Sequence, residues 1–182
     1  RRQRQMCIRD SLYTACNQGH GECVQLLLAA HAAIDQPDSD GVTPLHTACY
    51  LGHGECVQLL LAARAAIDQP TSDGYTPLYT ACDQGHGECV RLLLAAQATV
   101  DQPGREGYTP LHTACFEGMS ECVQLLLAAN AAVDQPRGSH QLRGNSTPIN
   151  TPTTPLHIAC QVGSFDIVKQ LLQAGARIDL TH

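Results

Sequence analysis

The chain has 182 residues, a formal net charge of −6, 43 % apolar residues and only 4 % aromatic residues, with no tryptophan. The acidic balance disfavours binding to the phosphate backbone of DNA or RNA. The apolar runs are far shorter than the roughly 20 residues that a membrane-spanning helix needs, and no secretory signal peptide is recognisable. We therefore expect neither a nucleic acid nor a membrane as partner. Because the sequence starts with Arg1 rather than Met, we also expect it to be part of a longer protein.

Residues 1–9 form a basic lead-in that contains four of the eleven basic residues of the chain. A short charged run at a terminus is most often a solvated, frayed end, and that is our interpretation. A small interaction arm is the alternative. The remaining residues, 10–182, carry seven basic and 17 acidic side chains.

The sequence repeats itself with a period of 33 residues. The stretch from Asp40 to Pro70 returns from Asp73 to Pro103, with 23 of 31 positions identical. Self-similarity at such a period is typical of repeat architectures. We predict one domain over 10–182, with repeats at about 10–39, 40–72, 73–105, 106–150 and 151–182. The last interval between Thr-Pro-Leu triplets is 45 residues instead of 33, which indicates a protruding insertion at about 137–149.

Each copy predicts two helices. In the second copy Thr43 is suited to cap a helix over Pro44–Leu51, with Pro at its first position and Gly52 after its end. A second helix is expected over Glu55–Ala63, because its apolar residues recur at helical spacing. That predicted face consists of Cys56, Leu59, Leu60 and Ala63. One such pair cannot bury its apolar face alone, whereas a stack of neighbours can.

The motif Thr-Pro-Leu-His-x-Ala occurs at Thr43–Ala48, Thr109–Ala114 and Thr154–Ala159, and Tyr79 replaces the histidine in the third copy. Together with the period, this motif resembles the ankyrin repeat over nearly the whole chain. The resemblance implies an all-α fold: an ankyrin-repeat solenoid of five helix-turn-helix repeats with β-hairpin or finger loops. It also implies that the first helices line a concave face, that arrays of this kind bind other proteins, and that they have no catalytic machinery of their own.

One feature departs from the family pattern. The family usually has Gly after the second helix, where the backbone turns left-handed, but His31, Arg64, Gln97 and Asn130 stand there in the first four copies. Left-handed geometry at a residue other than Gly costs roughly 1 kcal/mol. Either the four repeats accept this cost, or their helices end differently.

Nine of the ten cysteines recur at two fixed repeat positions inside helical apolar patterns. A cysteine in such a pattern behaves as a small apolar residue, so we expect these residues to be buried and reduced, and the protein to be cytoplasmic or nuclear. The two sets are Cys16, Cys49, Cys82, Cys115 and Cys160, and Cys23, Cys56, Cys89 and Cys122.

His-x-x-Cys pairs such as His46 and Cys49 share a helix face and have a spacing that zinc sites use. We interpret them as structural, because the third copy has Tyr79 at the histidine position and because the resemblance gives this histidine a role in the turn. The cysteines are interchangeable, without one distinctive nucleophile and base. We therefore expect no metal, no cofactor and no enzymatic activity.

The candidate binding residues are the positions at which the copies differ, since stacking constrains the others to stay alike. The resemblance places these positions at the finger tips and at the end of each first helix, facing the groove. They are Asp40, Val42, Tyr50, Leu51, Asp73, Tyr75, Asp83, Gln84, Arg105, Glu106, Tyr108, Phe116 and Glu117. Four aromatic residues among them are candidate anchors, since aromatic side chains often dominate binding energy. By contrast, Phe165 in the last second helix is expected in the core.

The sequence thus predicts a monomeric, non-enzymatic scaffold that binds another protein with a neutral to basic surface through its concave groove and finger tips. Two alternatives remain open: a substrate-targeting arm of a larger enzyme or ubiquitin-ligase adaptor, and a spacer that binds nothing specific.

Overall fold

The computed structural model describes residues 11–137 and 153–178, and all regular secondary structure in these ranges is helical. The predicted lead-in at 1–9 and all but the first residue of the predicted insertion at 137–149 lie outside them. A first helix covers residues 11–17. It is followed by α2 (Gly21–Ala29), α3 (Pro44–Leu51), α4 (Gly54–Ala62), α5 (Pro77–Asp83), α6 (Gly87–Ala95), α7 (Pro110–Phe116), α8 (Ser120–Ala128), α9 (Pro155–Val162) and α10 (Phe165–Gln173).

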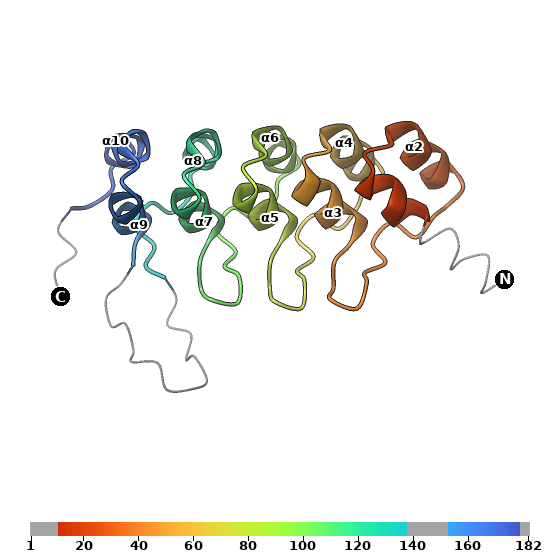
Figure 1. Ribbon diagram of the computed structural model, residues 1–182, viewed down its shortest axis with the longest axis horizontal. Helices are drawn as coiled ribbons and strands as arrows, with labels where there is room; N and C mark the ends of the chain where they lie inside the picture. The colour runs from red at the N-terminus through yellow and green to blue at the C-terminus, as the bar shows by residue number, and fades with distance from the viewer. Residues whose placement is uncertain (1–10, 138–152, 179–182) are drawn as a thin grey trace.

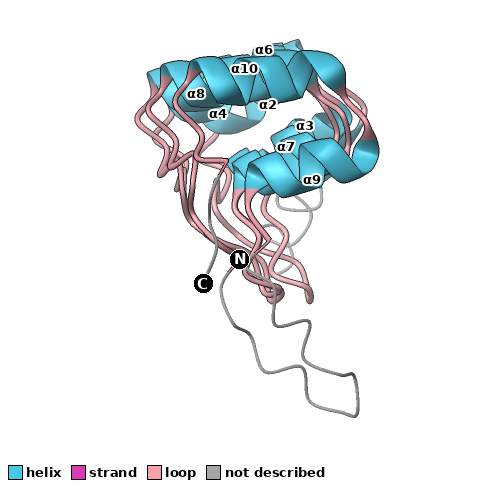
Figure 2. Ribbon diagram, turned by 90° about the vertical axis from the view of Figure 1, so that its left-hand side faces the viewer, coloured by secondary structure: helices cyan, strands magenta, loops and turns pink. Residues whose placement is uncertain are grey.

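The helices form two parallel rows. Helices α3, α5, α7 and α9 lie side by side in one row, and α2, α4, α6, α8 and α10 form the other (Figure 1). Finger loops extend from the row of first helices, on the side away from the second helices (Figure 2). This arrangement confirms the predicted all-α solenoid of stacked helix pairs. None of the described helices is long and apolar enough to cross a membrane.

Local sequence accounts for the first helices. Thr43 caps α3 by accepting a hydrogen bond from the backbone N–H of His46 (3.4 Å), and Pro44 occupies the first helical position, where its missing N–H is harmless. Gly52 ends the helix in the left-handed conformation, at φ 74°. The prediction for this helix is therefore confirmed. The second helix starts and ends one residue earlier than predicted, at Gly54–Ala62.

The core runs as a continuous column between the two rows of helices. Its largest fully buried side chains include one leucine from each of the helices α3 to α8: Leu45, Leu60, Leu78, Leu93, Leu111 and Leu126. In α4, Cys56, Val57 and Leu60 are buried, while Leu59 is half-buried and Ala63 is exposed. Ala63 was thus wrongly assigned to the buried face, because the chain already leaves the helix at this residue.

The second helices end in a left-handed residue after all. The φ angles of His31, Arg64, Gln97 and Asn130 lie between 59° and 68°. In the second repeat the N–H of Arg64 donates to the carbonyl of Leu61 and the N–H of Ala65 to that of Leu60, both at 3.0 Å. This pair of bonds is the Schellman ending usually made with Gly. The four repeats therefore accept the conformational cost.

Nine cysteines lie in the described ranges; all are free, and seven are buried. The expectation of burial is wrong for Cys23 and Cys160, which are exposed.

Phe165, expected in the core, has 77 % of its surface exposed. The first position of each second helix faces the following repeat. At Gly54, for example, a Cβ atom would lie 3.0 Å from the side chain of Glu88 in the third repeat. No described repeat follows Phe165, so its side chain has no neighbour to pack on.

The fingers are hairpin loops too short to be strands. In the finger of the third repeat, for example, the N–H of Thr71 donates to the carbonyl of Tyr75 at 3.0 Å and the N–H of Gly74 donates to the carbonyl of Thr71 at 2.9 Å. Neighbouring fingers are joined by bonds from Ser72 to Asp40 and from Arg105 to Asp73, both 2.9 Å. The predicted hairpin fingers are therefore present without regular β-structure.

Candidate functional site

A groove with a cavity of about 580 Å³ lies between the first helices and the fingers of the first three repeats. Five of the predicted binding residues line it: Val42, Tyr50, Leu51, Tyr75 and Asp83. The remaining lining residues are Tyr13, Asn17, His46, Thr47, Thr71, Tyr79 and Thr80. The groove is thus rich in tyrosine rings and contains a single charged carboxylate, Asp83.

A row of equivalent positions runs along the ends of adjacent first helices. Two of its members, Tyr50 and Asp83, line the groove, and Phe116 continues the row on the next first helix, outside the lining of the cavity. The row contains Tyr50 on α3, Asp83 on α5 and Phe116 on α7, and these helices pack directly against one another. Tyr50 is 52 % exposed and Phe116 is 64 % exposed, whereas Asp83 is half-buried. An acid therefore stands between two exposed aromatic rings. We call Tyr50, Asp83 and Phe116 the groove row.

Asp83 is positioned by its neighbour in sequence. The side-chain amide of Gln84 donates a hydrogen bond to Oδ2 of Asp83 at 2.7 Å. The ion pairs of the described ranges join Arg91 to Glu88 and Arg105 to Asp73, so Asp83 has no cationic partner there.

Tyr75 and Tyr79 form a stacked pair in this groove, with ring centroids 4.6 Å apart and planes inclined by 26°. Burial raises the pKa of Tyr79 to about 12, with a hydrogen bond to Thr113 acting in the opposite direction. Burial, together with the charges of Glu106, Asp73 and Asp83, raises the pKa of Tyr75. Both phenols therefore stay neutral and lie in a negative local potential.

Tyr79 was missed among the candidate binding residues, although the sequence contains a signal for it. It stands where the second and fourth copies have His46 and His112, and so it also belongs to the positions that differ. Tyr13 stands at the same position in the first copy and carries the same signal, and Thr71 also differs between copies, whereas Thr80 repeats as Thr47 and Thr113 and carries none.

Several of the predicted finger-tip residues bond to residues of a neighbouring finger, which their variation between copies did not indicate. Arg105 pairs with Asp73 at 2.7 Å. Arg137 lies 4.5 Å from the ring centre of Tyr108 and donates from Nε to the carbonyl of Glu106 at 2.9 Å. One face of Tyr108 is therefore covered, which reduces its value as an anchor. Of the other predicted residues, Asp40 and Glu117 are exposed and Gln84 is half-buried.

The histidines of the repeated motif have structural contacts. His46 accepts a hydrogen bond from the N–H of Thr43 at Nδ1 (3.2 Å), and its Nε2 bonds the carbonyl of Tyr75 at 3.0 Å. His112 repeats this arrangement with Thr109 and Thr153. Burial lowers the pKa of both rings, that of His112 to about 4. In the described ranges, no group of three or more His, Cys, Asp or Glu side chains has an arrangement suited to a metal ion.

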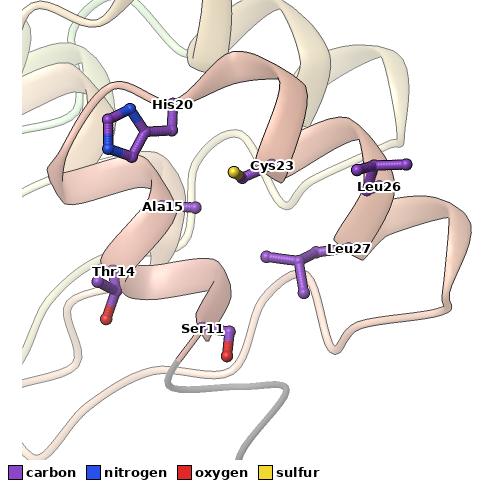
Figure 3. A pocket seen from close by; sticks show the side chains of 7 residues that line it. All are labelled: Ser11, Thr14, Ala15, His20, Cys23, Leu26 and Leu27. Atoms are coloured by element: carbon purple, nitrogen blue, oxygen red, sulfur yellow. The ribbon is translucent and has the colours of Figure 1, made fainter.

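A second cavity of about 560 Å³ lies at the outer side of the first repeat. Figure 3 shows its lining side chains on both helices of that repeat, among them Ala15, Cys23, Leu26 and Leu27. Residues 19–30 are identical to residues 52–63, yet Leu26 is 72 % exposed whereas the equivalent Leu59 is half-buried. The cavity is therefore a repeat-stacking surface that no described residue covers, and the groove is the better candidate site.

Comparison with known proteins agrees with this architecture. A family model described as "Ankyrin repeats (3 copies)" matches residues 4–71, 63–137 and 100–182. The chain is also 50 % identical over 42 residues to cortactin-binding protein 2 of Rattus norvegicus. That match covers 21 % of the chain and only 2 % of the rat protein. Ankyrin repeats generally mediate protein–protein interaction and are typically not enzymes. The matches span almost all of the sequence, and the chain belongs to the ankyrin repeat family.

Proposed function

We propose that this chain is a non-enzymatic module that binds a partner protein in the groove formed by its first helices and fingers. The observation that carries the proposal is the groove row. Its positions differ between copies that are otherwise nearly identical, and two of its three members are exposed aromatic rings. Exposed aromatic side chains beside a concave surface are typical of binding hot spots.

The charge around the groove favours a neutral to basic partner surface. Asp83 lines the groove without a cationic partner in the described ranges. Two further acids are exposed: Asp40 in the finger of the second repeat, and Glu117 after α7 in the fourth repeat. Complementary charge increases association rates and disfavours acidic competitors. We place this binding in the cytoplasm or nucleus, which suits an array whose core contains seven buried free thiols.

A second candidate function is a substrate-targeting arm of a larger enzyme or ubiquitin-ligase adaptor. It is favoured by the match to a short stretch of a much longer protein. In that case the groove has the same binding role, and the chemistry belongs to another part of the protein.

The proposal is tested by affinity capture with the purified chain and with the double variant Tyr50→Ala/Phe116→Ala. Proteins retained by the chain and lost by at least tenfold from the double variant are its groove partners. Phe165→Ala is the control, because this ring is also exposed, at 77 %, but lies in the second-helix row. Thermal unfolding of all variants shows whether each is folded. Equal capture by the chain and the double variant contradicts the proposal.

A further inference from the structure

We propose that the groove row selects a partner segment with one arginine between two apolar residues, each three positions away, in a polyproline II conformation. The inference rests on the proposed function and gives the chemistry of the bound segment. Asp83 binds the arginine, and the rings of Tyr50 and Phe116 bind the apolar side chains.

The position of Asp83 is not explained by the fold. It is the last residue of α5, where the helix dipole disfavours a negative charge. The equivalent positions of the neighbouring helices contain the uncharged Tyr50 and Phe116. Asp83 forms no ion pair in the described ranges, and the amide of Gln84 occupies only one position at Oδ2. A half-buried carboxylate is therefore held in the groove without its own counter-charge.

Covering Asp83 with a partner demands a cation. A carboxylate that loses water without gaining a charged partner is strongly disfavoured. Arginine suits this position better than lysine, because its planar fork bonds both carboxylate oxygens and its guanidinium stacks on aromatic rings. The stacked Tyr75 and Tyr79 provide such rings in the same groove, within electrostatic reach of Asp83. An acidic side chain would repel this carboxylate, and a neutral donor would leave its charge without a counter-charge.

The spacing of the row selects the conformation of the bound segment. Packed helices are about 8–10 Å apart, and the groove row advances by one first helix at each step. A polyproline II segment rises about 3.1 Å per residue with three residues per turn, so that every third side chain lies on one face, about 9 Å apart. A β-strand alternates its faces and would turn every third side chain away. The fit is therefore to apolar-x-x-Arg-x-x-apolar.

The test uses three fluorescein-labelled peptides and the full chain, with binding measured by fluorescence polarisation. The first is Leu-Pro-Pro-Arg-Pro-Pro-Leu, the second has citrulline in place of arginine, and the third has the arginine moved by one position. We expect the first peptide to bind at least tenfold more tightly than either of the others. Asp83→Asn should remove the difference between arginine and citrulline. Glu88→Gln, which neutralises an exposed acid on α6, should leave it unchanged.

Equal binding of the arginine and citrulline peptides overturns the inference, as does a preference that survives Asp83→Asn. Absence of binding by all three peptides at millimolar concentration also overturns it. Failure of the proposed function is seen separately. If Tyr50→Ala/Phe116→Ala abolishes protein capture while Asp83→Asn leaves it intact, the groove binds a partner but does not select arginine.

Discussion

Two rows of residues run side by side along the first helices: one is buried and identical from copy to copy, and the other varies. Cys49, Cys82 and Cys115 are fully buried and identical from copy to copy. The next residue in each helix belongs to the groove row and differs from copy to copy: tyrosine, aspartate and phenylalanine. The buried row packs inside the stack, so a change there must be accommodated by the neighbouring repeats. The groove row faces outward and is free to differ. Under the proposed function, stability and recognition are therefore separated by one position in the sequence.

The buried side of this comparison is tested most strongly by Leu60→Ala. Leu60 is fully buried in α4, and truncating a buried leucine leaves a cavity that costs about 3–5 kcal/mol. We expect the free energy of unfolding, measured in urea, to fall by about that amount. Leu26→Ala is the control, because Leu26 is 72 % exposed in the identical sequence of the first repeat. A loss of similar size in the control would mean that the outer side of the first repeat is covered in solution.

The second prediction concerns pH and the buried histidine of the capping motif. Burial lowers the pKa of His112 from its ordinary 6.5 to about 4. Between these values the unfolded chain binds a proton that the folded chain does not bind, so stability must fall as the pH decreases from 6.5 to 4. Above pH 6.5 the contribution is fully present. The shift corresponds to about 3 kcal/mol at its full extent.

His112→Tyr is the matched variant for this pH dependence, because the third repeat already has Tyr79 at the same position. A tyrosine does not titrate between pH 4 and 6.5. The difference in unfolding free energy between pH 7 and pH 4 should therefore be smaller in His112→Tyr than in the unchanged chain. Equal pH dependence of the two proteins would show that folding does not lower the pKa of His112.

The same comparison explains what could be predicted from the sequence. The Thr43 cap, the Gly52 ending and the stack follow from local chemistry and from the period, and the structure contains all three. The exposure of Phe165, Cys23 and Cys160 did not follow, because each faces a side on which the described array has no further repeat. Burial in a stack depends on the neighbour as much as on the residue.

The groove was predicted in outline. The positions that differ between copies identified five of its lining residues, including Tyr50 and Asp83. Tyr79 was missed because its position was assigned to the turn on the basis of the histidine found in other copies. The Arg105–Asp73 pair and the contact between Arg137 and Tyr108 join residues of different fingers. Such contacts depend on how the fingers lie next to one another, which a repeat pattern does not specify.

A third prediction separates backbone strain from side-chain packing. Arg64 ends α4 at a φ of 65°, a conformation that costs roughly 1 kcal/mol in residues other than Gly. Arg64→Gly should therefore raise the free energy of unfolding by up to about 1 kcal/mol. Asn tolerates left-handed geometry better than most residues, so Asn130→Gly at φ 60° should yield a smaller gain. The two variants are compared by urea unfolding, and an equal or reversed order contradicts the explanation.

The smallest expected effect lies in the groove row itself. Asp83 carries a negative charge at the C-terminal end of α5, where the helix dipole makes such a charge unfavourable by about 0.3–1 kcal/mol at low salt. Asp83→Asn should leave the thermal midpoint unchanged or slightly higher, and any rise should diminish as salt is added. The same substitution should weaken binding of an arginine-containing segment. A residue whose removal helps the fold and harms binding is retained for recognition; if Asp83→Asn instead destabilises the chain, the acid belongs to the fold, and the contrast between the two rows does not extend to this position.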